Sequence, residues 1–205
     1  MAINMAVKRG RKAQRRKQMV AEKRRFEPRD TGLAGRALRG ANAPVQLCFI
    51  TESVFDGGIG TLVLARGATP YHLTFASFLL DVFCLGIKDV MVESVVSDEF
   101  KAYLDAMDEA GSMVSIDPTD ARKLLRDLAA WSRSVGFAPH ADFAAAEKIF
   151  GDINADASDA QFEFGRDGKP LYIPGPYDTP SLIRRRLEQL QKHLGSDGFE
   201  IETAA

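Results

Sequence analysis

The densest apolar stretch of the chain runs from Tyr71 to Asp89 and has the sequence YHLTFASFLLDVFCLGIKD. Its apolar residues lie in almost every direction around a helix of 3.6 residues per turn, which is typical of a helix covered on most sides. Polar residues interrupt the stretch too often for a membrane span, which needs about 18 or more consecutive apolar residues. The pattern therefore predicts a buried central helix that ends at Gly86, where glycine supplies a left-handed residue.

Strands are predicted before and after this segment. Residues 44–53 (PVQLCFITES) and 59–66 (IGTLVLAR) are rich in strand-forming residues, and the Asp-Gly sequence between them predicts a hairpin. Residues 87–96 (IKDVMVESVV) predict a third strand. Residues 161–175 (QFEFGRDGKPLYIPG) predict two further short strands about an Arg-Asp-Gly-Lys turn.

Helices are predicted where a capping residue precedes an apolar repeat of 3.6 residues. They cover residues 97–110, 118–135, 141–150 and 180–194, and each ends next to a glycine. The order of these elements matches neither a regular βαβ alternation nor a helical bundle. It predicts a single α+β domain with a mostly antiparallel sheet, a buried central helix and several flanking helices.

The formal net charge of −1 conceals a strong division along the chain. Residues 1–40 carry 13 Lys and Arg against 3 Asp and Glu, whereas the other 165 residues carry 14 basic and 25 acidic side chains. Residues 1–43 have too few apolar side chains to bury a core, so we expect a disordered basic arm. The globular domain is expected at residues 44–195, and residues 196–205 are expected to be frayed.

The arm is the candidate nucleic-acid-binding segment. A basic arm of this kind holds phosphate backbones without reading their sequence, so RNA or the ribosome surface is the expected partner. The alternatives are a solvated tail and a tail that folds back on the acidic body. An organelle transit peptide is also Arg-rich, but no Ser precedes Ser53. The candidate binding residues are Lys8, Arg9, Arg11, Lys12, Arg15, Arg16, Lys17, Lys23, Arg24 and Arg25.

The two cysteines and the start of the chain bear on location. Cys48 and Cys84 both lie in apolar runs and form no disulfide framework, which favours a reducing, intracellular setting. The basic start has no apolar stretch behind it of the kind a secretory signal needs.

Three stretches resemble an uncharacterised group of bacterial proteins. They are FLLDVFCLGIKDV (residues 78–90), VGFAPHADFAAAEKIFGD (residues 135–152) and GKPLYIPGPYD (residues 168–178). The resemblance covers most of residues 44–195 and leaves out the basic arm. It implies a bacterial, cytoplasmic, single-domain protein and transfers no catalytic or binding residue.

Asp81, Cys84 and His140 are the candidate catalytic residues. A hydrolase or nuclease would use the Cys84 thiol or a metal, with His140 as a base, provided that folding brings these side chains together. His140 and Asp142 also form a candidate pair of metal ligands. The alternatives are that Asp81 pairs with a backbone donor or a cation, that Cys84 is a small buried hydrophobe, and that His140 or Asp142 caps a helix.

The most motif-like stretch is DINADASDAQFE, residues 152–163. Asp152, Asn154, Asp156 and Glu163 occupy positions 1, 3, 5 and 12 of the twelve-residue EF-hand calcium loop. Against calcium, Ala157 stands at position 6, where the sharp turn needs glycine, and a strand is predicted after the loop. An acidic surface loop that ends a helix explains the same residues.

Phosphate-loop, dinucleotide-binding and G-x-S-x-G motifs are missing from the sequence, so no cofactor is expected. The first hypothesis is therefore a non-enzymatic intracellular protein. Its acidic body would engage protein partners, and its arm would contact RNA or another polyanion. The second hypothesis is the metal- or thiol-dependent hydrolase or nuclease, with its site near the central helix.

Overall fold

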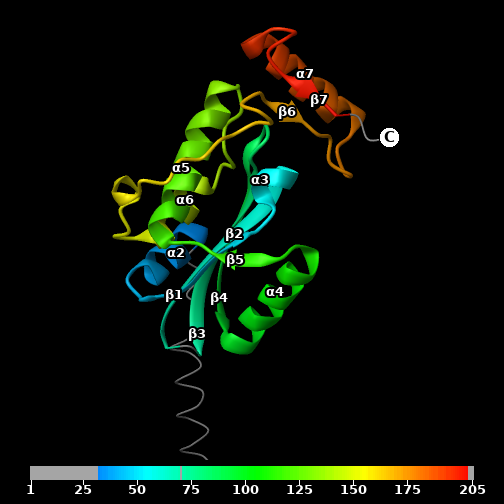
Figure 1. The fold of residues 1–205 in the computed structure, drawn as a ribbon. Coiled ribbons are helices and arrows are strands. Elements are labelled where there is room, and N and C mark those ends of the chain that lie inside the picture. The colour runs from blue at the N-terminus through cyan, green and yellow to red at the C-terminus, as the bar shows by residue number, and fades with distance from the viewer. Residues whose placement is uncertain (1–31, 70, 203–205) are drawn as a thin grey trace, which may run out of the picture. The chain divides into compact units, whose positions relative to one another are not determined.

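An antiparallel sheet of five strands organises the chain, in the spatial order β4-β3-β2-β1-β5 (Figure 1). The computed structural model describes residues 32–69 and 71–202. The strands are β1 (Val45–Thr51), β2 (Ile59–Thr69), β3 (His72–Asp81), β4 (Gly86–Val96) and β5 (Met113–Ser115). A second, parallel pair joins β6 (Leu171–Tyr172) to β7 (Glu200–Ile201). The predicted α+β class and mostly antiparallel sheet are confirmed.

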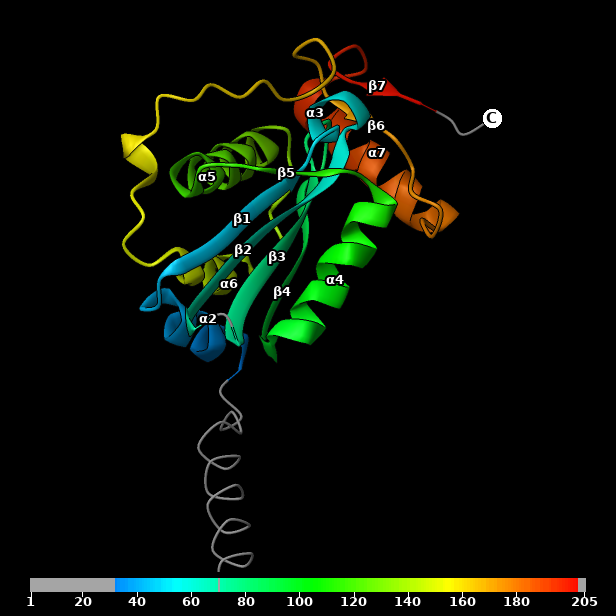
Figure 2. The same ribbon diagram turned by 60° about the horizontal axis from the view of Figure 1, so that its bottom comes forward.

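Helices cover both faces of the sheet, and α4 lies on the opposite side from α2, α5 and α6 (Figure 2). In the described residues they are α2 (Leu33–Ala41), α3 (Val54–Gly57), α4 (Ser97–Ala110), α5 (Pro118–Ser134), α6 (Phe143–Ala146) and α7 (Pro180–Leu194), with short 3-10 turns η1 (Glu147–Phe150) and η2 (Ala155–Ala157). None of these helices is both long and apolar enough to cross a membrane.

The larger core lies between the sheet and the layer of α2, α5, α6 and η1. Side chains at alternate positions of β2 and β3, such as Leu62, Leu64 and Phe78, point into it. The intervening positions, including Val63 and Phe75, form a smaller core under α4. The two central strands are therefore apolar on both faces.

The predicted central helix is wrong. Residues 71–89 contain β3, a tight turn and the start of β4, and the two strands pair along their whole length from His72↔Val96 to Asp81↔Gly86. A strand buried on both faces shows a continuous apolar run rather than alternation, and such a run cannot be distinguished from a buried helix by its period alone. Gly86 is left-handed as predicted, with φ +76°, but it belongs to the turn.

The ends of the domain also differ from the prediction. Helix α2 falls within the region assigned to the basic arm, yet Ala37 is fully buried in the larger core. The compact unit therefore begins at Leu33. At the other end, β7 lies in the segment expected to fray and pairs with β6. Residues 161–164 are not a strand, although an Arg166↔Lys169 bridge closes the predicted turn.

The capping signals predicted the longer helices well. Helices α5 and α7 begin where expected, with Asp117 and Thr179 as N-caps that accept hydrogen bonds from Thr119 N and Leu182 N. Helix α4 begins one residue earlier than its predicted cap allows, because Ser97 is its first residue and Val96 takes the N-cap position. The helix predicted at residues 141–150 is shorter, because only Phe143–Ala146 is α-helical before the chain tightens into η1.

Candidate functional site

Asp81 and Cys84 lie together in the buried turn between β3 and β4. The Asp81 carboxylate accepts hydrogen bonds from the backbone N–H groups of Phe83 (3.2 Å) and Cys84 (2.8 Å), and the residue is 4% exposed. Burial raises the pKa of Asp81, although these backbone donors and the charge of Lys88 oppose the shift. Asp81 therefore fastens the turn, which confirms the interpretation that it pairs with backbone donors.

Both thiols are buried and free of disulfides. Burial raises the pKa of Cys84, and the neighbouring Asp81 charge raises it further, against a smaller opposing effect of Arg186. Burial likewise raises the pKa of Cys48 to about 12, with Asp117 adding to the shift. A thiol must ionise to act as a nucleophile, so neither cysteine is poised for attack at neutral pH.

His140 lies beside the start of the edge strand β4. Its backbone N–H donates to Ile87 O (2.8 Å), and its Nδ1 accepts from the N–H of Asp142 (3.2 Å). Its Nε2 stands 3.8 Å from Asp89 Oδ1. The imidazole therefore fastens the short turn before α6, whereas Asp142, at the N-cap position, makes no side-chain capping hydrogen bond, so the predicted helix cap is not formed. Asp142 offers His140 a backbone group rather than a carboxylate.

The EF-hand-like residues do not converge. Asn154 accepts from the N–H of Asp156 within η2, the side chain of Asp152 faces Arg66, and Glu163 lines a separate pocket beside Phe55. In the segments that the structure covers, no group of three or more His, Cys, Asp and Glu side chains is arranged to hold a metal ion. The ten basic residues predicted to bind nucleic acid, from Lys8 to Arg25, lie outside the described residues.

Arg66 is the most deeply buried cation in the described part of the chain. It ends the apolar run of β2 and is 4% exposed. Its guanidinium donates to the carbonyls of Ala41, Ala43 (3.0 Å) and Phe150 (2.9 Å). One side chain therefore ties the end of α2 and the end of η1 to the sheet.

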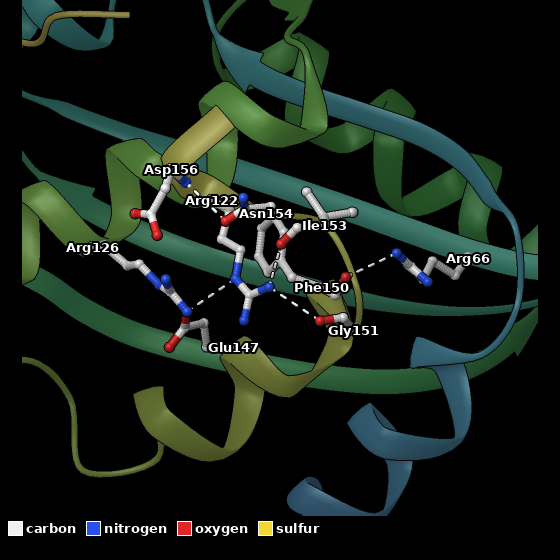
Figure 3. Close-up of polar contacts among 9 residues, drawn as sticks. All are labelled: Arg66, Arg122, Arg126, Glu147, Phe150, Gly151, Ile153, Asn154 and Asp156. Atoms are coloured by element: carbon white, nitrogen blue, oxygen red, sulfur yellow. Dashed lines mark hydrogen bonds and ion pairs between the residues drawn. The ribbon is translucent and has the colours of Figure 1, made fainter. Parts of the chain in front are cut away.

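Arg122 performs a similar task from α5. It donates to the carbonyls of Gly151 (3.1 Å) and Ile153, pairs with Glu147 (3.3 Å), and lies over the ring of Phe150. Figure 3 shows Arg66 and Arg122 reaching the chain at Phe150–Ile153 from different sides. These contacts hold the segment after η1 in place.

A pocket of about 820 Å³, called here the basic pocket, opens beside this segment. Arg66, Arg122, Lys148 and Asp152 provide its charged lining. Sequence reasoning missed it because no short motif connects the three basic residues. The available signal was a lone Arg at the end of an otherwise apolar strand, where a buried charge needs partners.

A second polar cluster fastens the C-terminal helix. Fully buried Tyr172 donates its hydroxyl to Asp178 Oδ2 (3.1 Å), and Asp178 also accepts from Gly175 N (2.9 Å) and pairs with Arg186. Partial burial favours a higher pKa for Asp178, but the Gly175, Tyr172 and Arg186 donors outweigh it and hold the pKa below its usual value. Asp178 is therefore the ionised centre of a clamp between β6 and α7.

The clamp predicts a pH-dependent loss of stability in Asp178→Asn. A lowered folded-state pKa gives stability that is complete above the unfolded pKa of about 3.9 and is lost as pH falls through the folded value. The variant should be less stable than the parent by about 1–2 kcal/mol at pH 7, and the gap should shrink below pH 4. Urea unfolding from pH 2 to pH 7 measures this, with exposed Asp105→Asn as the control. A gap that stays constant over this range would contradict the clamp.

Comparison of the chain with protein-family models, with curated proteins and with solved structures found no match.

Proposed function

We propose that this is a non-enzymatic binding protein of the bacterial cytoplasm whose basic arm holds RNA or another polyanion while its acidic body engages protein partners. The observation that carries the proposal is the charge division. Residues 1–31 carry 11 Lys and Arg against 3 Asp and Glu, whereas residues 32–205 carry 16 against 25. The change of sign falls at the start of the compact unit, Leu33.

Counterion release explains why such an arm would bind a polyanion. Each phosphate that a Lys or Arg neutralises frees condensed counterions, so affinity rises with the number of contacts and falls steeply with salt. The acidic body repels the same phosphates, which would confine the contact to the arm. The body itself presents a negatively charged surface, opposite in charge to the arm. Helix α4 exposes Asp98, Glu99, Asp105, Asp108 and Glu109 against the single Lys101.

The geometry gives less support to a hydrolase or nuclease. Asp81 is committed to backbone donors, and the Cys84 thiol is fully buried with a raised pKa. His140 makes its contacts at the edge of β4, with Ile87, Asp89 and Asp142.

Replacing the ten arm residues by glutamine should abolish the electrostatic part of RNA binding. The substituted positions are Lys8, Arg9, Arg11, Lys12, Arg15, Arg16, Lys17, Lys23, Arg24 and Arg25. For a single-stranded 20-mer at about 50 mM salt we expect affinity to fall by roughly 100-fold or more, and the plot of log affinity against log salt to become nearly flat. Fluorescence anisotropy across a salt series measures both quantities.

The control carries Arg184→Gln, Arg185→Gln and Lys192→Gln on the exposed face of α7 and should bind as the parent does. A parent chain that binds RNA with no salt dependence, or an arm variant that binds as tightly as the parent, would refute the arm's role. Deletion variants should start at Gly32, because cutting at residue 43 removes α2 and its buried Ala37.

A further inference from the structure

The residues that line the basic pocket carry donors that the chain does not use. Arg66 Nε is buried and has no hydrogen-bond partner in the described structure. Buried polar groups are almost always hydrogen-bonded, so this N–H is a donor in need of an acceptor. The other two nitrogens of the Arg66 guanidinium donate hydrogen bonds to three backbone carbonyls. The unused donor therefore belongs to a guanidinium that is held rigidly in place.

Two further cationic side chains line the same pocket, and each has donor groups without a partner among the described residues. Arg122 commits Nε to Glu147 and Nη1 to the carbonyls of Gly151 and Ile153, and within the described residues its Nη2 forms no hydrogen bond. Lys148 is exposed, and its ammonium group forms no ion pair with any residue that the structure describes. The free donors thus come from β2, α5 and η1.

The charge of the pocket is opposite to that of its surroundings. Three cations and one carboxylate line it, although acidic residues outnumber basic ones by 25 to 16 in residues 32–205. A concave site lined mainly by one sign of charge concentrates ligands of the other sign. The pocket should therefore attract anions that the rest of the body repels.

We infer that the basic pocket binds the phosphate group of a small organic ligand. A phosphate has several strong acceptor oxygens directed to different sides, which suits donors arriving from three elements, whereas a carboxylate is planar and suits a single Arg fork. The volume of about 820 Å³ lies in the range of small-molecule sites and leaves room for a ligand of mononucleotide size. Leu38 and Pro44, both exposed, provide an apolar wall for its organic part.

Asp152 occupies the place that such a phosphate would take. Its carboxylate stands 3.6 Å from Arg66 Nη2, and its side chain is 95% exposed. An ion pair with so exposed a partner adds little stability, so the side chain is free to turn outward when a stronger anion arrives. Removing the Asp152 charge should then strengthen ligand binding, which is the reverse of what a general loss of structure would cause.

The test is a titration of the isotope-labelled full-length protein with a nucleoside 5′-monophosphate, followed by NMR. The amide signals of Gly151 and Asp152 should shift, while those of α4 stay fixed. Lys148→Gln should weaken binding by roughly three- to fivefold, and Asp152→Asn should strengthen it by a similar factor, because each exposed charge contributes modestly. Lys101→Gln on α4 removes another exposed cation, outside the pocket, and should change nothing. Arg66 and Arg122 are left intact because they also hold the backbone.

Two comparison probes distinguish the contribution of the phosphate group to binding from that of the nucleoside. The unphosphorylated nucleoside should not bind, and inorganic phosphate should bind more weakly than the nucleotide. The inference is overturned if the Gly151 and Asp152 signals do not move at up to about 10 mM nucleotide, or if the nucleoside binds as well as the nucleotide. It is also overturned if both charge variants match the parent. The variant whose ten arm residues are replaced by glutamine should bind the nucleotide as tightly as the parent does. Failure of this test can therefore be told apart from failure of the proposed RNA contact.

Discussion

Replacing Arg66 with methionine is expected to lower the free energy of unfolding by about 3–5 kcal/mol. The substitution keeps much of the aliphatic volume but removes every donor. The carbonyls of Ala41, Ala43 and Phe150 then lose their partner, and Ala41 and Phe150 are buried residues that water does not readily reach. Each stranded buried acceptor costs about 1–3 kcal/mol. Urea unfolding followed by circular dichroism measures the loss.

Two variants make the Arg66 result specific. Arg66→Lys keeps the charge but replaces a planar fork by a single point donor, so it should recover only part of the lost stability. Arg184→Met removes an exposed Arg from α7 and should change stability by less than about 0.5 kcal/mol. A loss below about 1 kcal/mol for Arg66→Met would mean that the three carbonyls find other donors. That outcome would remove Arg66 as the link between β2, α2 and η1.

Local signals predicted several caps and turns of this chain correctly. Asp117 and Thr179 cap helices because a side-chain oxygen next to the first turn meets free N–H groups whatever the tertiary fold. The Arg-Asp-Gly-Lys turn formed for a similar reason, since Asp167 and Gly168 both adopt positive φ. These features depend on a few neighbouring residues, and the sequence displays those residues directly.

Features that depend on tertiary packing were mispredicted. The β3 strand lies between two cores, and its apolar residues on both faces produced the pattern of a buried helix. The sequence predicts arm rather than helix for LAGRALRGA because the segment has few large apolar residues and contains Gly35 and Gly40. Its small residues are what permit close packing, since a Cβ on Gly40 would lie 2.9 Å from the Thr74 side chain. That partner is far away in sequence.

The candidate sites show the same division between local and distant contacts. Asp81 and His140 are candidates because of their side-chain chemistry. In the structure, the same oxygen and nitrogen atoms accept hydrogen bonds from the backbone within local turns. Arg66, Arg122 and Lys148 had no shared motif, and only the packing of β2, α5 and η1 brings them to one pocket. The spacing of residues along the chain reveals a site only when one helix, strand or loop holds all of its side chains. The side chains of this pocket come from several elements, so no spacing in the sequence indicates it.

Replacing Gly86 with alanine is expected to destabilise the protein by about 3–4 kcal/mol, for two separable reasons. Gly86 has φ +76°, a conformation that costs an L-residue about 1–2 kcal/mol. A Cβ at this position would also lie 2.5 Å from the Cβ and Oγ of Ser132, which is fully buried in α5. The turn between β3 and β4 would have to move away from α5, and overpacking of this kind costs about 1–3 kcal/mol.

Gly168→Ala isolates the first of these reasons. Gly168 has the same φ of +76°, but a Cβ there would meet nothing within 4 Å, so we expect a loss of only about 1 kcal/mol. The difference between the two variants measures the clash with α5. Ser132→Gly removes the opposing atoms, so in a double-mutant cycle it should recover about 2 kcal/mol of the Gly86→Ala loss beyond additivity. Equal losses at Gly86 and Gly168, with no coupling to Ser132, would show that the turn does not pack against α5 as closely as the structure indicates.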